Sequence, residues 1–247
     1  MSAPQARPFL LALALGASAC ASPAGALAQP AVLLSSSPVL DARGIPQGWE
    51  PLTFKKIGRR TEYSWSAPEH TLHALSSASA SGLLFRLDQE AAAAPLLRWR
   101  WRVSHSIARG NERSKKGDDY AARVYVTFKY DPAKAGRALR LKYGIIKALY
   151  GEYPPHSGIS YIWANRLPKG ESVPNAYTGR VRMLALRSGE GEAGRWAGEE
   201  RDILADYRRL YGEDPPPLSG VALMTDTDDT ASSAEAWYAD IELLARP

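Results

Sequence analysis

The last part of the chain, residues 218–244, constrains the fold most, because its apolar residues recur at every second position. Val221 and Leu223 precede an acidic, hydroxyl-rich loop, and Ile241 and Leu243 follow it at the same spacing. Successive side chains of a β-strand point to opposite faces of a sheet, so this pattern indicates two strands with one buried face each. The chain is therefore expected to end in a hairpin of two strands.

Short β-type runs recur along the rest of the chain, separated by Gly, Pro and Ser residues that are typical of turns. Strands are predicted at residues 52–56, 63–66, 71–76, 82–87, 97–103, 122–130, 158–164 and 180–187. A basic segment at 131–150 and an amphipathic segment at 199–211 follow helical spacing instead. We therefore predict an all-β (mainly β) fold, a single β-sandwich of the jelly-roll or concanavalin-like type with one or two short helices.

The clearest strand in the middle of the chain, residues 97–103, alternates large apolar residues with Arg98, Arg100 and Arg102. Two interpretations of these arginines remain open. They pair with acids on neighbouring strands, or they line a concave face for an anionic ligand, since the guanidinium group suits carboxylate or phosphate. The apolar faces of the strands form the expected core: Leu97, Trp99, Trp101, Val124, Val126, Phe128, Val221, Leu223, Ile241 and Leu243.

The first 28 residues have the composition of a secretory signal peptide, because Arg7 precedes an apolar run and small residues surround Ala28. Residues 29–44 are predicted to be a leader or linker, and residues 45–247 a single sandwich domain. This predicts a periplasmic or secreted protein. A lipoprotein anchored through Cys20 is the alternative, since Ala17-Ser-Ala-Cys20 loosely matches a lipoprotein cleavage site. No second apolar run reaches the length of a membrane span.

Composition argues against several classes of function. Cys20 is the only cysteine, so a disulfide framework and a thiol nucleophile are not expected. The four histidines are dispersed, which disfavours a zinc site, and no Gly-x-Ser-x-Gly turn presents a serine nucleophile. The formal net charge of +5 is spread along the chain, so nucleic acid is not a predicted partner. We also expect a monomer.

Acidic residues gather in two places. Asp118 and Asp119 precede a predicted strand, and Asp226, Asp228 and Asp229 lie in the closing loop. Carboxylate chemistry is the one enzymatic option that remains. Asp118 or Asp119 with Asp226 or Asp228 would supply the acid and base of glycoside cleavage, and Asp119 with Asp226 is the pair we name as catalytic candidates. The alternative is that these acids only accept backbone hydrogen bonds in turns, where Asp is common.

Asp226 and Asp228, together with Asp240 on the closing strand, also suggest a structural calcium ion, since calcium takes roughly six to eight oxygen ligands. In the alternative interpretation Asp226 and Asp228 accept backbone N–H groups of the turn, and Asp240 pairs with an arginine of a neighbouring strand. No other cofactor is expected.

Six distinctive motifs follow one another along the chain: Leu97-Arg-Trp-Arg-Trp101, Gly117-Asp-Asp-Tyr-Ala-Ala-Arg-Val-Tyr125, Ile159-Ser-Tyr-Ile-Trp163, Asn175-Ala-Tyr-Thr178, Glu200-Arg-Asp-Ile-Leu-Ala-Asp-Tyr207 and Thr225-Asp-Thr-Asp-Asp-Thr230. In this order they resemble an exported bacterial family described only as a domain of unknown function (DUF3047-like). The resemblance covers about residues 45–244 and implies no known activity. Gly44-x-x-x-Gly48-Trp49 and Tyr238-x-Asp240-Ile-x-Leu243 also look like the first and last strands of jelly-roll carbohydrate-binding modules.

Aromatic residues beside polar loops favour a sugar ligand, because ring faces stack on the C–H groups of sugars while polar side chains bind the hydroxyls. Of the seven tryptophans in the chain, Trp163, Trp196 and Trp237 lie near such loops. The sequence predicts a cell-envelope domain that binds a glycan or another polar ligand. A glycan-cleaving enzyme and a structural envelope protein without a ligand are the alternatives. The candidate ligand-binding residues are Asp118, Asp119, Arg123, Tyr161, Trp163, Asn175, Tyr177, Asp226 and Asp228.

Overall fold

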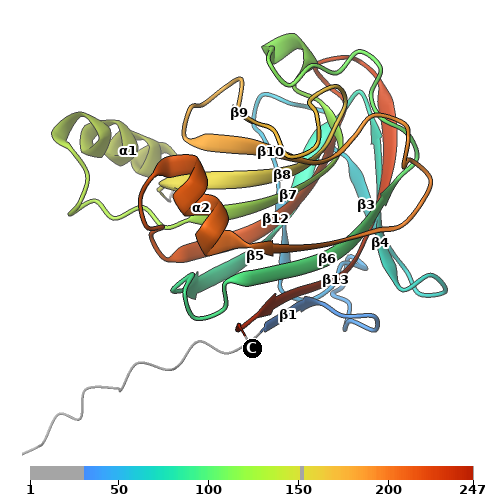
Figure 1. Ribbon diagram of the computed structural model, residues 1–247, viewed down its shortest axis with the longest axis horizontal. Coiled ribbons are helices and arrows are strands. Elements are labelled where there is room, and N and C mark those ends of the chain that lie inside the picture. The colour runs from blue at the N-terminus through green and yellow to red at the C-terminus, as the bar shows by residue number, and fades with distance from the viewer. Residues whose placement is uncertain (1–30, 151–152, 247) are drawn as a thin grey trace, which may run out of the picture.

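Strands with one apolar face build two sheets that pack against each other, which confirms the predicted mainly β sandwich (Figure 1). The computed structural model describes residues 31–150 and 153–246. The predicted signal peptide and Cys20 lie outside the described residues.

The first sheet has six strands. Its order is β11 (Ala197–Asp202), β6 (Leu96–Val103), β13 (Ser233–Leu244), β4 (Thr71–Ser77) and β3 (Glu62–Ser66), with β1 (Ala31–Leu34) paired to β13.

The second sheet has seven strands. All its neighbouring strands are antiparallel except β8 and β10, which run parallel. Its order is β2 (Trp49–Leu52), β5 (Ala80–Gln89), β12 (Leu218–Asp226), β7 (Tyr120–Phe128), β8 (Ser157–Ala164), β10 (Val181–Ser188) and β9 (Ser172–Pro174).

The chain crosses repeatedly from one sheet to the other, as in jelly-roll sandwiches. The strands β4 to β7 alternate between the sheets, and so do β10 to β13. The last two strands therefore belong to opposite sheets, and the predicted closing hairpin is wrong. The alternation of apolar residues in both strands was predicted correctly. Two consecutive strands show the same period-two pattern whether they pair with each other or belong to opposite sheets.

All ten residues predicted for the core are completely buried. The tryptophans of β6 lie at the centre of the core and meet rings of β8. The ring centroids of Trp99 and Tyr161 lie 5.4 Å apart, and those of Trp101 and Trp163 lie 5.9 Å apart. Aromatic contacts between the sheets therefore hold the two layers together.

The predicted boundary between leader and domain at residue 45 is wrong, because β1 is part of the first sheet. Ala31 and Val32 pair with Leu243 and Glu242 of β13, and Leu34 is buried in the core. The predicted strand at 52–56 is also misplaced, since β2 ends at Leu52.

The predicted helix at 199–211 consists of two elements. Its first residues belong to β11, which pairs with β6, and helix α2 (Ile203–Tyr211) begins only after Asp202. The Asp202 carboxylate accepts the backbone N–H of Ala205 and caps the helix, and Gly212 ends it with a left-handed conformation. Pairing with β6 overrides the helical spacing of residues 199–202.

The arginines of β6 pair with acids on neighbouring elements, as the first of the two interpretations predicts. Arg98 bonds to Glu200 of β11, and Arg100 bonds to Asp240 of β13. Arg102 lies 3.7 Å from Glu69. These contacts explain the arginine face without a ligand.

The predicted basic excursion is confirmed as helix α1 (Arg137–Tyr150), which lies beside the sandwich and not within it (Figure 1). A 3₁₀ turn at Lys115–Gly117 precedes β7. Among the described residues, no helix combines the length and the apolar character of a membrane span.

Replacing Trp101 by alanine is expected to lower the free energy of unfolding by about 3–5 kcal/mol, because it removes a fully buried ring from the centre of the core. Chemical denaturation measures this loss. Trp196→Ala is the matched control, since Trp196 is 37% exposed and lies beside Arg100 and Arg102, so its loss is expected to cost about 1 kcal/mol. Equal losses in the two variants would contradict the assignment of Trp101 to the core.

Candidate functional site

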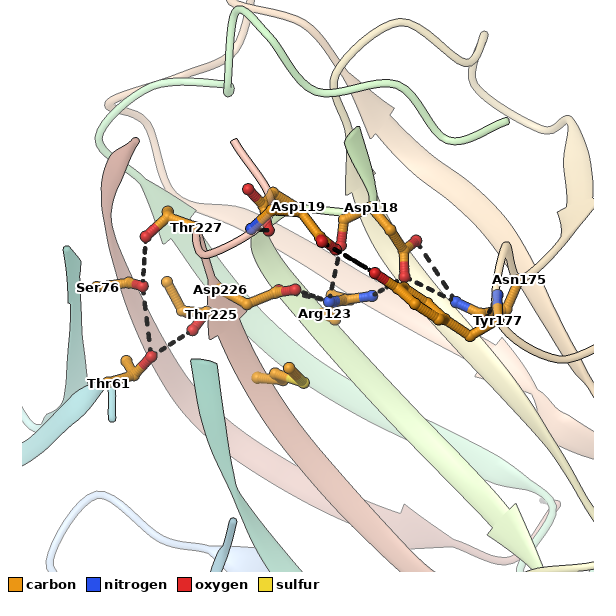
Figure 2. A network of polar contacts seen from close by, with 12 residues as sticks. Thr61, Ser76, Asp118, Asp119, Arg123, Asn175, Tyr177, Thr225, Asp226 and Thr227 are labelled. Carbon is orange, nitrogen blue, oxygen red and sulfur yellow. Dashed lines mark hydrogen bonds and ion pairs between the residues drawn. The ribbon is translucent and has the colours of Figure 1, made fainter. Parts of the chain in front are cut away.

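Most of the predicted site residues meet at one end of the seven-stranded sheet (Figure 2). Asp118 lies just before β7, and Arg123 lies in the first half of that strand. Asp226 is the last residue of β12, and Asn175 and Tyr177 lie in the loop between β9 and β10. Strands β7 and β12 are neighbours, so residues more than a hundred positions apart become adjacent. Strand pairing therefore builds this site.

Arg123 and Asp226 form a buried ion pair at the centre of the site. The side chains are both 3% exposed, and Nε of Arg123 donates to Oδ1 of Asp226 at 2.9 Å. Arg123 also donates to the carbonyl oxygen of Asp118 at 3.2 Å, and its guanidinium lies 4.4 Å from the centre of the Tyr120 ring. Multiple partners thus compensate the desolvation of this cation.

Asp118 and Tyr177 lie on the other side of Arg123 and are themselves held in place. The Asn175 side-chain amide donates to Oδ2 of Asp118 at 3.1 Å. The Tyr177 hydroxyl donates to both carboxylate oxygens of Asp229, at 2.9 and 2.8 Å. The loop between β9 and β10 is thereby tied to the loop between β12 and β13.

Asp119 holds the closing loop and is not available to a ligand. It is completely buried, and its carboxylate accepts the backbone N–H of Asp229 at 3.2 Å and that of Thr230 at 2.6 Å. The Thr230 hydroxyl donates to the same carboxylate at 2.5 Å. The prediction that Asp119 binds a ligand or transfers a proton is therefore wrong, because its oxygens already serve the loop.

A chain of buried hydroxyl groups connects this loop to the other sheet (Figure 2). Thr61 donates to the carbonyl oxygen of Thr225 at 2.7 Å, and the hydroxyls of Ser76 and Thr227 lie 2.8 Å apart. Ser79 lies 2.9 Å from Ser76 and extends the chain. Satisfied buried hydrogen bonds of this kind keep the end of β12 in one position.

The remaining acids of the loop, Asp228 and Asp229, are at least partly exposed. Burial, together with repulsion by Asp119 and Asp229, raises the pKa of Asp228 above its usual value. Burial also raises the pKa of Asp229, although the hydrogen bond from Tyr177 acts against it. These two carboxylates are the accessible acceptors of the site.

A cavity of about 780 Å³ opens beside the acids. Phe54, Tyr125 and Met224 line it together with the acid cluster. A second cavity of about 510 Å³ shares these three residues and extends to Tyr130 and Tyr153 near the base of α1. The two cavities thus adjoin in one groove across the outer face of the seven-stranded sheet, apolar along its length and acidic at one end.

Two predicted ligand residues, Tyr161 and Trp163, do not reach this groove. Both are completely buried in the core, where they contact the tryptophans of β6. The prediction that they stack on a ligand is wrong, because they point to the inner face of the sheet. The alternation of β8 showed that they share a face, and only packing showed that this face is the inner one.

Sequence reasoning missed the aromatic and apolar residues of the groove. For Tyr125 the signal was present, since it alternates with Val124 and Val126 and shares the outward face of β7 with Arg123. Phe54 was assigned to a strand, whereas it follows the end of β2.

A calcium ion fits these residues poorly. Oxygens of Asp119, Asp226 and Asp228 lie within 4.8 Å of one another. The Asp226 carboxylate, however, is neutralised by Arg123, and the Asp119 carboxylate already accepts three hydrogen bonds. Asp240, the third predicted ligand, bonds to Arg100 in the other sheet, so its predicted place in a metal site is wrong. The guanidinium of Arg123 supplies the positive charge that an ion would provide.

The acids of the groove are also poorly arranged for glycoside cleavage, which needs two opposed carboxyl groups. The Asp226 carboxylate bonds to Arg123, and the Asp118 carboxylate, just before the neighbouring strand β7, lies 3.7 Å from the same guanidinium. Asp228 follows Asp226 closely in the chain. The wall formed by residues 53–57 carries lysines and no carboxylate.

The fold and the groove define a β-sandwich domain with an elongated groove across one sheet. The chain belongs to the DUF3047 family, described as a protein of unknown function, which matches residues 47–242. No curated protein matches the sequence.

Solved structures with a similar fold include carbohydrate-binding modules. The family 11 module of the cellulosomal cellulase Lic26A-Cel5E of Clostridium thermocellum is 11% identical, with a TM-score of 0.43, and the match covers 88% of this chain and 95% of the module. The family 30 module of Cel9D-Cel44B from the same organism is also 11% identical, with a TM-score of 0.43 and coverage of 89% and 99%. A cellulase derived from Cel12A of Rhodothermus marinus is 10% identical, with a TM-score of 0.40 and coverage of 78% and 94%.

Replacing Arg123 by methionine is expected to lower the free energy of unfolding by about 3–5 kcal/mol, because it leaves the buried Asp226 carboxylate without its cation. Chemical denaturation at neutral pH measures the loss. Arg98→Met is the matched control, since the pair of Arg98 with Glu200 is half exposed and worth at most about 1 kcal/mol. Similar losses in both variants would show that burial does not distinguish the two pairs.

The melting temperature is expected to be the same in millimolar calcium and in chelator, because the guanidinium of Arg123 already neutralises the Asp226 carboxylate that a calcium ion would bind. Differential scanning calorimetry on chelator-treated protein tests this. An ion that binds only the folded state at a hundredfold excess over its dissociation constant stabilises it by about 2.7 kcal/mol, which raises the melting temperature by several degrees. Such a rise, absent in Asp228→Asn, would establish a calcium site and contradict our expectation.

Proposed function

We propose that this protein binds a glycan chain in the groove across its seven-stranded sheet. The observation that carries the proposal is the groove itself, in which aromatic and apolar side chains continue for the length of two adjoining cavities and end at accessible carboxylates. Ligand sites of this kind are typically about 300–1,000 Å³, mostly apolar, with a few polar groups that fix orientation.

The two parts of the groove have different roles in the proposal. Phe54 and Tyr125 present ring surfaces on which the C–H faces of sugar rings stack. Asp228 and Asp229 accept hydrogen bonds from sugar hydroxyls at the acidic end, and Tyr177 orients Asp229. Because the acids are grouped at one end, they set the direction of the bound chain.

We further propose that the protein acts in the cell envelope, as a periplasmic or secreted protein or as a lipoprotein anchored through Cys20. The support is the signal-peptide pattern of residues 1–28. An envelope or extracellular polysaccharide is the corresponding ligand class.

Binding of soluble polysaccharides, first on a glycan array and then by calorimetry, tests the proposal. We expect Phe54→Ala and Tyr125→Ala each to weaken binding about tenfold or more, because each removes a stacking surface from the groove. Trp196→Ala and Trp237→Ala are matched controls, since these rings lie on the other sheet and contact arginines, and they are expected to bind as the parent does.

Melting temperatures of the four variants show whether they are folded. No binding to any glycan would contradict the proposed function. Binding that depends on Trp196 or Trp237 and not on Tyr125 would move the site to the other sheet.

A further inference from the structure

Helix α1 and the turn before it form a continuous basic segment. Between Asp131 and Glu152 the sequence contains no acidic residue. It contains five cations, and all of them are exposed. These cations are Lys134, Arg137, Arg140, Lys142 and Lys147.

Acids in the described part of the chain do not neutralise this charge. Within residues 31–150 and 153–246, none of the five cations forms an ion pair with an Asp or Glu side chain. Arg140 donates to the carbonyl oxygen of Ala135 at 3.1 Å, and Lys147 lies 4.5 Å from the centre of the Tyr153 ring. Neither contact places a negative charge beside the segment, so it stays basic with respect to the described residues.

One face of α1 is anchored to the body of the protein. Tyr143 is buried, its ring centroid lies 4.5 Å from that of Tyr130, and its hydroxyl donates to the carbonyl oxygen of Pro155 at 3.1 Å. Tyr130 and Pro155 also line the groove. The helix is therefore held by one side, close to the end of the groove opposite the acids.

The opposite face of α1 carries an exposed apolar residue between cations. Leu141 is 70% exposed. It lies two residues before Tyr143 and so about 200° around the helix from it. Arg137 and Lys142 flank Leu141 on this outer face, and Ala138 beside them is also exposed. The outer face is thus apolar at its centre and basic at its margins.

We infer that α1 is a docking surface for an anionic lipid bilayer. An amphipathic helix that lies on a membrane inserts its apolar face among the acyl chains and places basic side chains among anionic headgroups. Long cationic side chains beside an apolar residue reach outward to the headgroups, which suits Arg137 and Lys142. A nucleic acid would match the charge but would leave Leu141 without an apolar environment.

This inference is independent of glycan binding, because the outer face of α1 and the groove are different surfaces. Docking through α1 would hold the groove near the membrane surface, since Tyr130 belongs to both the groove and the anchor of the helix. With 14 residues, α1 is too short to span a bilayer and fits a position parallel to its surface.

Co-sedimentation of the folded protein with vesicles tests the inference. We expect binding to vesicles of equal parts phosphatidylglycerol and phosphatidylcholine, little binding to phosphatidylcholine alone, and release at high salt. The double variant Arg137→Glu/Lys142→Glu is expected to bind at least about tenfold more weakly, because two attractions become repulsions. Leu141→Glu is expected to weaken binding without removing a cation.

Arg59→Glu/Arg60→Glu is the control, since it makes the same change of net charge at exposed positions away from α1. It is expected to bind vesicles as the parent does. An equal loss in this control, or no binding of the parent to anionic vesicles, would overturn the inference. Retention on dextran sulfate without vesicle binding would also overturn it, in favour of a soluble polyanion.

Discussion

The ion pair between Arg123 and Asp226 is the interaction on which the candidate site depends. It joins neighbouring strands β7 and β12 where both are buried, and the same guanidinium bonds to the backbone of Asp118. The Asp118 carboxylate in turn accepts a hydrogen bond from the side-chain amide of Asn175. The positions of β12, the segment before β7 and the loop between β9 and β10 therefore all depend on one cation. A buried charge is tolerated only when it is paired and hydrogen-bonded, and this requirement makes the end of the groove a defined structure instead of a set of mobile loops.

The two faces of the seven-stranded sheet have different tasks, and each strand contributes to both. On β7, Val124 and Val126 pack into the core, whereas Tyr125, the residue between them in the sequence, points to the opposite face and lines the groove. The inner face is stabilised by contacts between rings of both sheets, those of Tyr161 with Trp99 and of Trp163 with Trp101. Because the core carries the stability, the outer face is free to present aromatic and acidic groups to a ligand, which is the basis of the proposed glycan binding.

Several residues of the candidate site were predicted from the sequence, but the sequence did not separate their roles. Asp118, Asn175, Tyr177 and Asp226 do come together, since acids and amides in loops beside strands mark the ends of a sheet. Asp119 belongs to the same cluster but holds the closing loop. Neighbouring acids in a sequence look alike, and only the hydrogen-bond partners of each carboxylate show which one is used by the fold and which remains for a ligand.

The sequence by itself determined the fold class and the composition of each strand face, because side chains alternate along any strand and apolar residues must be buried. It also placed the helical excursion at 131–150 correctly. The tertiary structure decided which strands pair. Strand pairing in turn placed Tyr161 and Trp163 on the inner face, put Asp240 and Asp226 in different sheets, and made residues 197–202 a strand. The physical reason is that period-two alternation is a local property, whereas the partner of a strand and the face that meets the other sheet depend on contacts between residues far apart in the chain.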